Sequence, residues 1–337
     1  MQDDILAIAL ELSESTRSKI ADLDQIMMKT KILTMNARLE AARAGEAGKS
    51  FAVVAQEMGA IAGEVNDLSA ALQANVTQNA SRIREAGEGM AIALRGTRLS
   101  DLARNAVEII DRNLYERSCD VRWWATDSAV VDALEQATPE ACAHASSRLG
   151  TILRSYTVYL DLWIADRNGR IVATGRPERY RGLAGADVSG ADWFRRGRHT
   201  ATGDDFAVCD VAVEPRLGNA AVAAYSTAIR AGGRADGAPI GVLGIFFDWA
   251  PQARAIVDSV SLSAEEREKS QVMLLDSQMR IIACNRRERE GQVYPLKPDQ
   301  PIGHYIAGAR LIGYGLTPGY ETYRGLGWYG CIESALS

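Results

Sequence analysis

Histidine is scarce in this 337-residue chain and cysteine is scattered, which excludes several kinds of site. Only three histidines are present, and none of the five cysteines is spaced as Cys-x-x-Cys. A structural zinc site needs clustered cysteine and histidine ligands, and a disulfide framework needs paired cysteines. We therefore expect reduced thiols, no metal and no other cofactor.

Long apolar runs are also lacking. The longest uncharged apolar stretch, residues 238–247, is well short of the roughly 20 residues that a helix needs to cross a bilayer. The chain begins Met-Gln-Asp-Asp, whereas a secretory signal begins with basic residues followed by an apolar stretch. We expect no membrane span and a cytoplasmic location.

Signatures of nucleic-acid binding and of catalysis are missing too. The 38 basic residues are outnumbered by 43 acidic ones, with no basic block to attract a phosphate backbone. Gly48-Lys49-Ser50 ends like a phosphate-binding loop, but Arg43 stands where that motif requires its first glycine. No nucleophile elbow, cofactor fingerprint or ordered pair of carboxylates is present, so we expect neither a nucleic-acid partner nor an enzyme.

The first part of the chain contains no proline before Pro139 and is typical of long helices. Apolar or small residues recur at alternating steps of four and three, which predicts a coiled-coil seam. Gly45 and Gly48 predict a sharp reversal between two arms, and the second arm has no breaker before Asp132. The expected seam residues include Leu23, Ile26, Thr30, Leu33 and Ala37 on the first arm, and Val54, Met58, Ile61, Val65, Leu68 and Leu72 on the second. One hairpin cannot bury such a seam, so we expect a homodimer or higher oligomer with a four-helix bundle.

After residue 150 the pattern changes to short strands separated by turn residues. Strands are expected at residues 158–166, 170–174, 205–213, 220–229 and 240–249. The segment 162–173 is echoed by 273–283, at an offset of 110 residues from Asp166 to Asp276. In both copies, an apolar strand leads to a turn that opens with aspartate, and a second apolar strand follows. This repeat predicts two related α/β modules in tandem.

The most informative stretch lies at the expected reversal. Residues 32–57 read Ile-Leu-Thr-Met-Asn-Ala-Arg-Leu-Glu-Ala-Ala-Arg-Ala-Gly-Glu-Ala-Gly-Lys-Ser-Phe-Ala-Val-Val-Ala-Gln-Glu. This string resembles the hairpin tip of methyl-accepting chemotaxis proteins (MCPs). The resemblance implies a tip that packs receptor dimers into trimers and contacts the histidine kinase CheA and the coupling protein CheW. Carried over position by position, the implied contact residues are Ile32, Leu33, Asn36, Glu40, Arg43 and Val53.

Two features depart from the MCP pattern. Residues 28–31 read Met-Lys-Thr-Lys where the family usually carries Phe-Gln-Thr-Asn, so Lys29 and Lys31 add positive charge near the tip. The arms also lack the adjacent Glu/Gln pair flanked by small residues that marks methylation in this family. The resemblance therefore implies a simplified transducer without adaptation by methylation.

The C-terminal two thirds resemble double Cache sensor domains, which bind metabolites in the pocket of one module. The resemblance is carried by residues 113–117, 192–194, 241–248 and 320–328. In amino-acid-binding members, an arginine two residues before the tryptophan holds the ligand carboxylate, and an aspartate on a later strand holds the amine. Ala191 and Phe246 occupy those positions here, so the resemblance implies a ligand other than an amino acid.

The expected ligand-binding residues are aromatics that line the pocket, aspartates that orient a cationic or hydrogen-bonding group, and two lid residues of a Gly-flanked loop. In that order they are Trp163, Trp193, Phe194 and Tyr225; Asp205 and Asp248; and Tyr180 and Arg181. The alternative for each aromatic is a place in the hydrophobic core.

Together these patterns predict an α+β fold. The resemblances imply a long antiparallel helical hairpin that continues into a double Cache domain with PAS-like antiparallel sheets. The expected boundaries are 1–95 for the hairpin, 96–260 for the long helix with the first module, and 261–337 for the second module. The expected function is a chemoreceptor-like transducer that senses a small metabolite and signals through its tip. The alternative is a structural oligomerisation or scaffold module whose Cache domain binds no ligand.

Overall fold

The computed structural model describes residues 2–336, with side chains described from residue 7 onward. The chain divides after Leu94 into two compact units. Helix α2 (Lys49–Trp124) belongs to the first unit up to Leu94 and to the second from Arg95 onward. We call the first the hairpin unit and the second, from Arg95, the sheet unit. No helix within residues 2–336 has the length and apolar character needed to cross a membrane.

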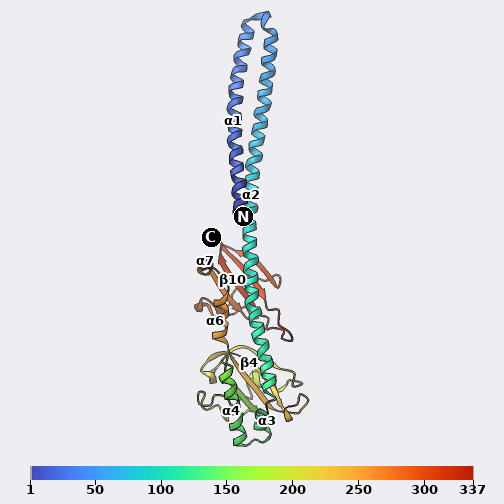
Figure 1. Cartoon of the computed structure of the whole chain (residues 1–337), viewed down its shortest axis with the longest axis vertical. Coiled ribbons are helices and arrows are strands. Elements are labelled where there is room, and N and C mark those ends of the chain that lie inside the picture. The colour runs from blue at the N-terminus through green and yellow to red at the C-terminus, as the bar shows by residue number, and fades with distance from the viewer. Residues whose placement is uncertain (1, 337) are drawn as a thin grey trace. The chain divides into compact units, whose positions relative to one another are not determined.

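The hairpin unit consists of α1 (Gln2–Arg43), a short 3₁₀ turn (Gly45–Gly48) and the first part of α2, which runs back along α1 (Figure 1). The predicted reversal at Gly45 and Gly48 is confirmed. Gly45 has a φ of +57°, which glycine adopts without strain. A Cβ on Gly48 would lie 2.2 Å from the carbonyl oxygen of Ala41, so a side chain there would force the arms apart.

The two arms meet along a narrow line of small residues at seven-residue spacing. The buried positions are Ile20, Thr34 and Ala41 on α1, Gly48 at the end of the 3₁₀ turn, and Ala55, Ala62 and Ser69 on α2. Across this line, Ser69 donates a hydrogen bond to Asp24 at 2.6 Å. Most residues of the expected coiled-coil seam lie elsewhere, because Leu23, Ile26, Leu33 and their counterparts on α2 are 40–69% exposed. Small residues let the two helices approach closely, and the larger apolar residues are left facing outward.

The sheet unit contains two five-stranded antiparallel sheets, in the orders β2-β1-β5-β4-β3 and β7-β6-β10-β9-β8. The first sheet contains β1 (Tyr159–Asp166), β2 (Ile171–Thr174), β3 (Ala207–Glu214), β4 (Ala220–Arg230) and β5 (Pro239–Asp248). The second contains β6 (Ser270–Leu275), β7 (Ile281–Cys284), β8 (Ile302–Ala307), β9 (Arg310–Leu316) and β10 (Tyr329–Ala335). Each of the five strands expected between residues 158 and 249 is present, with bounds shifted by two residues at most.

Five shorter helices complete the sheet unit, and one boundary differs from the prediction. They are α3 (Ser128–Glu135), α4 (Pro139–Ser155), α5 (Asp192–Arg198), α6 (Trp249–Ser259) and α7 (Ala264–Lys269). The expectation that the long helix runs on to Asp132 was wrong, because α2 ends at Trp124. The side chain of Asp127 accepts a hydrogen bond from the backbone N–H of Ala129 and caps α3 as a separate helix.

The tandem repeat expected from the sequence is confirmed by the strand pairing. Trp163 pairs with Thr174 between β1 and β2, just as Met273 pairs with Cys284 between β6 and β7. Both turns are closed in the same way: Asp166 accepts from the N–H of Arg170, and Asp276 from that of Arg280, each at 2.9 Å. We call the part built on β1–β5 the first module and the part built on β6–β10 the second module.

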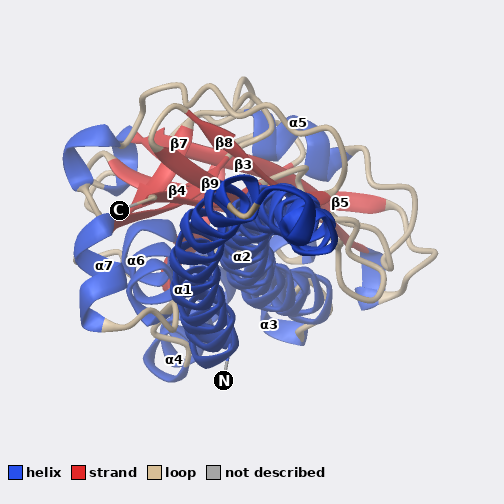
Figure 2. Cartoon of the chain, turned by 90° about the horizontal axis from the view of Figure 1, so that it is seen from above, coloured by secondary structure: helices blue, strands red, loops and turns tan. Residues whose placement is uncertain are grey.

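Helix α2 lies along one face of both sheets, as the view in Figure 2 shows. Against the second sheet it lies directly on the backbone, where a Cβ on Gly330 would be 1.9 Å from the carbonyl oxygen of Ala103. Against the first sheet it packs on side chains, because the Tyr159 hydroxyl donates a hydrogen bond to Asp120 of α2. The guanidinium of Arg117 lies 5.2 Å from the centre of the Tyr159 ring.

Candidate functional site

The tip of the hairpin unit presents all six expected contact residues to solvent. Ile32, Leu33 and Val53 are 52–61% exposed, and Asn36, Glu40 and Arg43 are exposed as well. Arg43 donates to Glu40 at 2.7 Å, one helical turn away, and an exposed pair of this kind adds little stability. These side chains therefore contribute little to holding the hairpin together and are free to contact another molecule.

Three further apolar residues near the tip are exposed and are not among the predicted contact residues. Met35, Leu39 and Phe51 are 57–59% exposed. The seven-residue spacing of the small residues is the sequence signal for them, because Met35 and Leu39 lie off the buried line through Thr34 and Ala41, and Phe51 lies off the one through Gly48 and Ala55.

The first module contains a cavity of about 660 Å³ beside α5 and β3. Trp193, Asp210 and Phe246 line it, together with Arg280 from the second module. Trp193 lies in the first turn of α5, and Gly244 of β5 makes room for its ring, because a Cβ there would lie 2.8 Å from the indole. The indole Nε1 of Trp193 is buried and has no hydrogen-bond partner among residues 7–336. A bound acceptor would satisfy this donor.

Asp210 is one of two partly buried acids that line this cavity, the other being Glu214. Desolvation by burial raises the pKa of Asp210, although Trp328 of the second module donates to its carboxylate at 3.4 Å. Arg280 brings a positive charge to the same cavity and is paired with Asp276 at 2.7 Å. An aromatic wall with acidic and basic side chains together suits a small polar molecule that both donates and accepts hydrogen bonds.

The structure brings together only some of the expected ligand-binding residues. Trp163, Trp193 and Phe194 share one buried cluster with Phe246, and Tyr180 packs against that cluster. Trp163 also donates to the buried carboxylate of Asp161 at 2.9 Å. Half-buried Asp248 follows Phe246 by two residues on β5. Of the eight expected residues, only Trp193 lines the cavity itself.

The remaining expected residues lie away from this cavity. Successive residues of a strand face opposite sides, so Tyr225 points away from the face on which Ala224 lines the cavity. Tyr225 stacks instead near Phe206, with ring centres 6.3 Å apart. Asp205 is exposed and accepts from the N–H of Thr202, and Arg181 is exposed on its loop.

Asp210 and Arg280 were not identified as site residues from the sequence. Asp210 lies within an expected strand, and Arg280 lies in the repeated turn, where its N–H donates to Asp276. The second module supplies Arg280 to a cavity of the first, and this placement depends on how the two modules pack. No local sequence signal reports that packing.

Comparison with known proteins assigns the hairpin. Residues 7–110 match the family described as the methyl-accepting chemotaxis protein (MCP) signalling domain. Residues 7–110 are an MCP signalling domain. Relatives include the methyl-accepting chemotaxis citrate transducer of Salmonella typhimurium, 36% identical over 112 residues, which are 30% of this chain and 20% of that protein. Methyl-accepting chemotaxis protein I of Escherichia coli is 37% identical over 112 residues, with the same two shares. The chain thus spans about a fifth of the length of these relatives.

The sheet unit has the fold of double Cache sensor domains. The sensory domain of the Campylobacter jejuni chemoreceptor Tlp3 matches with a TM-score of 0.55 at 16% identity, covering 74% of this chain and 96% of that one. The sensor domain of the V. cholerae histidine kinase DctB matches with a TM-score of 0.52 at 12% identity, covering 73% and 98%. The predicted α+β fold, a helical hairpin followed by a double Cache domain, is confirmed.

Proposed function

We propose that the chain is a non-enzymatic chemoreceptor-type transducer. Its Cache domain binds a small molecule, and its MCP signalling domain passes the signal to the kinase CheA and the coupling protein CheW. The observation that carries this proposal is the exposure of Ile32, Leu33, Asn36, Glu40, Arg43 and Val53 at the tip of a matched signalling domain.

We also propose that two hairpins associate as a homodimer. Outward-facing apolar residues run along both arms, including Leu23, Ile26, Ile61 and Leu68. Burying one such side chain contributes about 1.5–3 kcal/mol, so a second hairpin would recover a large free energy along the rod. A four-helix bundle is the arrangement that covers two such faces at once.

The cavity beside Trp193 is our proposed ligand site. The C. jejuni Tlp3 sensory domain has been solved with isoleucine bound. In this chain, Ala191 and Phe246 offer no charge where amino-acid-binding members hold the carboxylate and the amine. Polar contacts would come instead from Asp210, Arg280 and the Trp193 indole, which favours a polar ligand that is not held as an α-amino acid.

A capture assay tests the tip. CheA and CheW of the source organism should be retained by the wild-type chain, and Glu40→Ala and Arg43→Ala should each weaken retention about tenfold, as expected for loss of a charged contact. Glu64→Ala and Arg82→Ala are matched controls, because both side chains are exposed on α2 away from the tip. Equal retention by all four variants would remove the support for this assignment.

A thermal-shift screen against a metabolite library tests the sensor. Ligand that binds only the folded state raises the melting temperature by mass action. A ligand of the proposed cavity should lose its effect in Asp210→Asn. If no metabolite shifts the wild-type chain while CheA and CheW are still retained, the scaffold alternative is favoured.

A further inference from the structure

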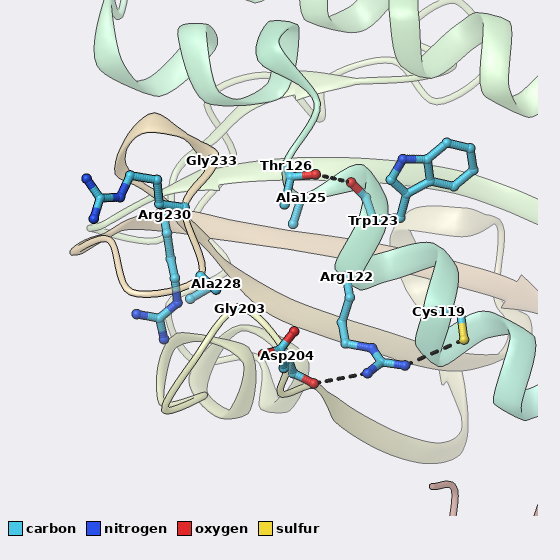
Figure 3. Close-up of a pocket in the computed structure, with 12 residues that line it drawn as sticks. Cys119, Arg122, Trp123, Ala125, Thr126, Gly203, Asp204, Ala228, Arg230 and Gly233 are labelled. Atoms are coloured by element: carbon cyan, nitrogen blue, oxygen red, sulfur yellow. Dashed lines mark hydrogen bonds between the residues drawn. The ribbon is translucent and has the colours of Figure 1, made fainter. Parts of the chain in front are cut away.

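We propose a second binding site in the first module, for a small carboxylate or phosphate, distinct from the cavity beside Trp193. A cavity of about 370 Å³ lies between the last turns of α2, the loop at residues 203–204 and the end of β4 with its following loop (Figure 3). Arg122, Arg230 and Arg234 line it, and Asp204 is the one acid among its lining residues.

Arg230 carries a buried charge that has no counter-ion among the described residues. The residue is only 6% exposed, and its guanidinium donates to two backbone carbonyls, of Gly237 at 2.9 Å and of Thr200 at 2.6 Å. Its Nε is buried without a hydrogen-bond partner in the described part of the chain. No carboxylate there forms an ion pair with it. A buried cation without a counter-ion is unfavourable, so the cavity beside it favours an anion.

Arg122 adds a second positive group, held in place by neutral atoms only. It donates to the Ser118 carbonyl at 2.8 Å, to the Asp204 carbonyl at 3.2 Å and to the Cys119 sulfur at 3.5 Å. Figure 3 shows this side chain reaching from α2 to the Asp204 loop. The guanidinium is therefore already positioned, and an oxyanion would meet it without a large ordering cost.

The other charged groups around this cavity leave its positive character intact. Arg234 is largely neutralised by Asp236 at 2.9 Å, and the Asp204 side chain is exposed. The carbonyls at the end of α2 would repel an anion, but those of Val121, Trp123 and Trp124 accept backbone hydrogen bonds from the residues that follow.

Guanidinium geometry and cavity size define the ligand class. The planar fork of arginine pairs with carboxylate and phosphate through two parallel hydrogen bonds. The volume admits a small organic acid or a phosphate. Such a ligand would bridge the end of α2 and the end of β4, a contact that the proposed transducer function does not require.

Titration of the full chain with succinate and with inorganic phosphate, each against sodium chloride at equal ionic strength, tests this site. We expect at least one of the two to raise the melting temperature above the chloride baseline and to bind by calorimetry. Arg122→Gln should weaken binding about tenfold or more, the loss expected for one charge-assisted hydrogen bond. Comparison of the two titrations distinguishes a carboxylate ligand from a phosphate.

Two controls separate this site from general charge and from the cavity beside Trp193. Arg154→Gln removes an exposed guanidinium that donates to neutral Thr151 outside the cavity, and should leave binding unchanged. Asp210→Asn should also leave it unchanged. Arg230→Met should abolish the response. It removes an unpaired buried charge but also the hydrogen bonds to the Gly237 and Thr200 carbonyls, so its melting temperature in chloride is measured alongside to show that the variant is folded. No response of the wild-type chain to either oxyanion at millimolar concentration, or an equal response in Arg122→Gln, overturns the proposal.

Discussion

The two modules of the sheet unit share a strand order but meet α2 differently. In the first module, Leu162 pairs with Ile245, which pairs in turn with Tyr225. In the second module, the repeat equivalent of Leu162 is Val272, which pairs with Ile332, and Ile332 pairs with Gly313. Tyr225 and Gly313 therefore occupy equivalent positions. By the same pairing, Thr227 and Leu243 of the first module correspond to Gly315 and Gly330 of the second.

Glycine at all three positions brings α2 onto the backbone of the second sheet. A Cβ on Gly313, Gly315 or Gly330 would lie 1.9–2.8 Å from atoms of α2. In the first module the same positions carry side chains, and the helix contributes Arg117 and Asp120 to a polar contact with Tyr159. Close backbone packing resists displacement, whereas side chains have alternative rotamers, so the contact with the first module is the one more able to rearrange.

The largest expected effect comes from truncating Tyr225, the side chain that the first module carries at the position of Gly313. Tyr225 is fully buried, and Tyr225→Ala should lower the free energy of unfolding by about 4 kcal/mol through lost burial and a cavity. Equilibrium urea unfolding measures this change. Tyr225→Phe keeps the ring and should cost less than about 1 kcal/mol. Similar losses in the two variants would show that the ring does not carry the contact.

The second expected effect is a pH dependence from Asp161, a carboxylate that the second module lacks at the equivalent position. Asp161 is equivalent to Gln271, and burial raises its pKa to about 6 although Leu162, Trp163 and Gly175 donate N–H groups to it. Its folded pKa exceeds the unfolded value of 3.8, so its contribution is greatest below pH 4 and is lost as pH rises through about 6. The loss amounts to about 3 kcal/mol.

Asp161→Asn imitates the neutral amide of the second module and should remove this dependence. Urea unfolding at several pH values between 4 and 7 gives the slope for each protein. A variant whose stability falls with pH as steeply as that of the wild type would assign the dependence to other groups.

The third expected effect comes from adding a methyl group at the backbone contact of the second module. Gly330→Ala forces the Ala103 carbonyl away and should cost about 2 kcal/mol by overpacking. Gly190→Ala is the control, because a Cβ on Gly190 meets no atom within 4 Å. Thermal unfolding gives the melting temperatures of both variants. Equal values would contradict the close approach of α2 to β10.

The smallest expected effect distinguishes the two repeated turns. Each of Asp166 and Asp276 accepts two backbone N–H groups, but the Asp276 side chain is only 2% exposed and is also paired with Arg280. Asp276→Ala should therefore cost about 1 kcal/mol more than Asp166→Ala. Urea unfolding of the two alanine variants measures the difference, and the opposite order would contradict the role given to the Arg280 pair.

The features that depend on residues close in sequence could be predicted. The reversal at Gly45 and Gly48, the strands between residues 158 and 249, and the repeated Asp-initiated turns depend on residues close in sequence. The end of α2 was not predictable from the same signals, because apolar residues continue past Trp124 into α3. There the Asp127 cap decides the break.

The ligand-binding residues were harder to predict, for a reason visible in β4. All residues from Val222 to Arg230 are buried, so alternation between apolar and polar side chains does not show which face lines the cavity. The sequence therefore does not show that Tyr225 and Trp193 lie on opposite sides of the sheet. The unpaired charge of Arg230 is equally hidden, because a sequence does not report whether an arginine has a counter-ion.

The glycine contacts between α2 and the second sheet also constrain the length of the helix. One residue turns an α-helix by about 100°, so a single insertion or deletion between Leu99 and Ala103 would rotate different side chains toward Gly313 and Gly330. Many replacements on the solvent side of this segment should be tolerated, whereas a change of one residue in its length should not.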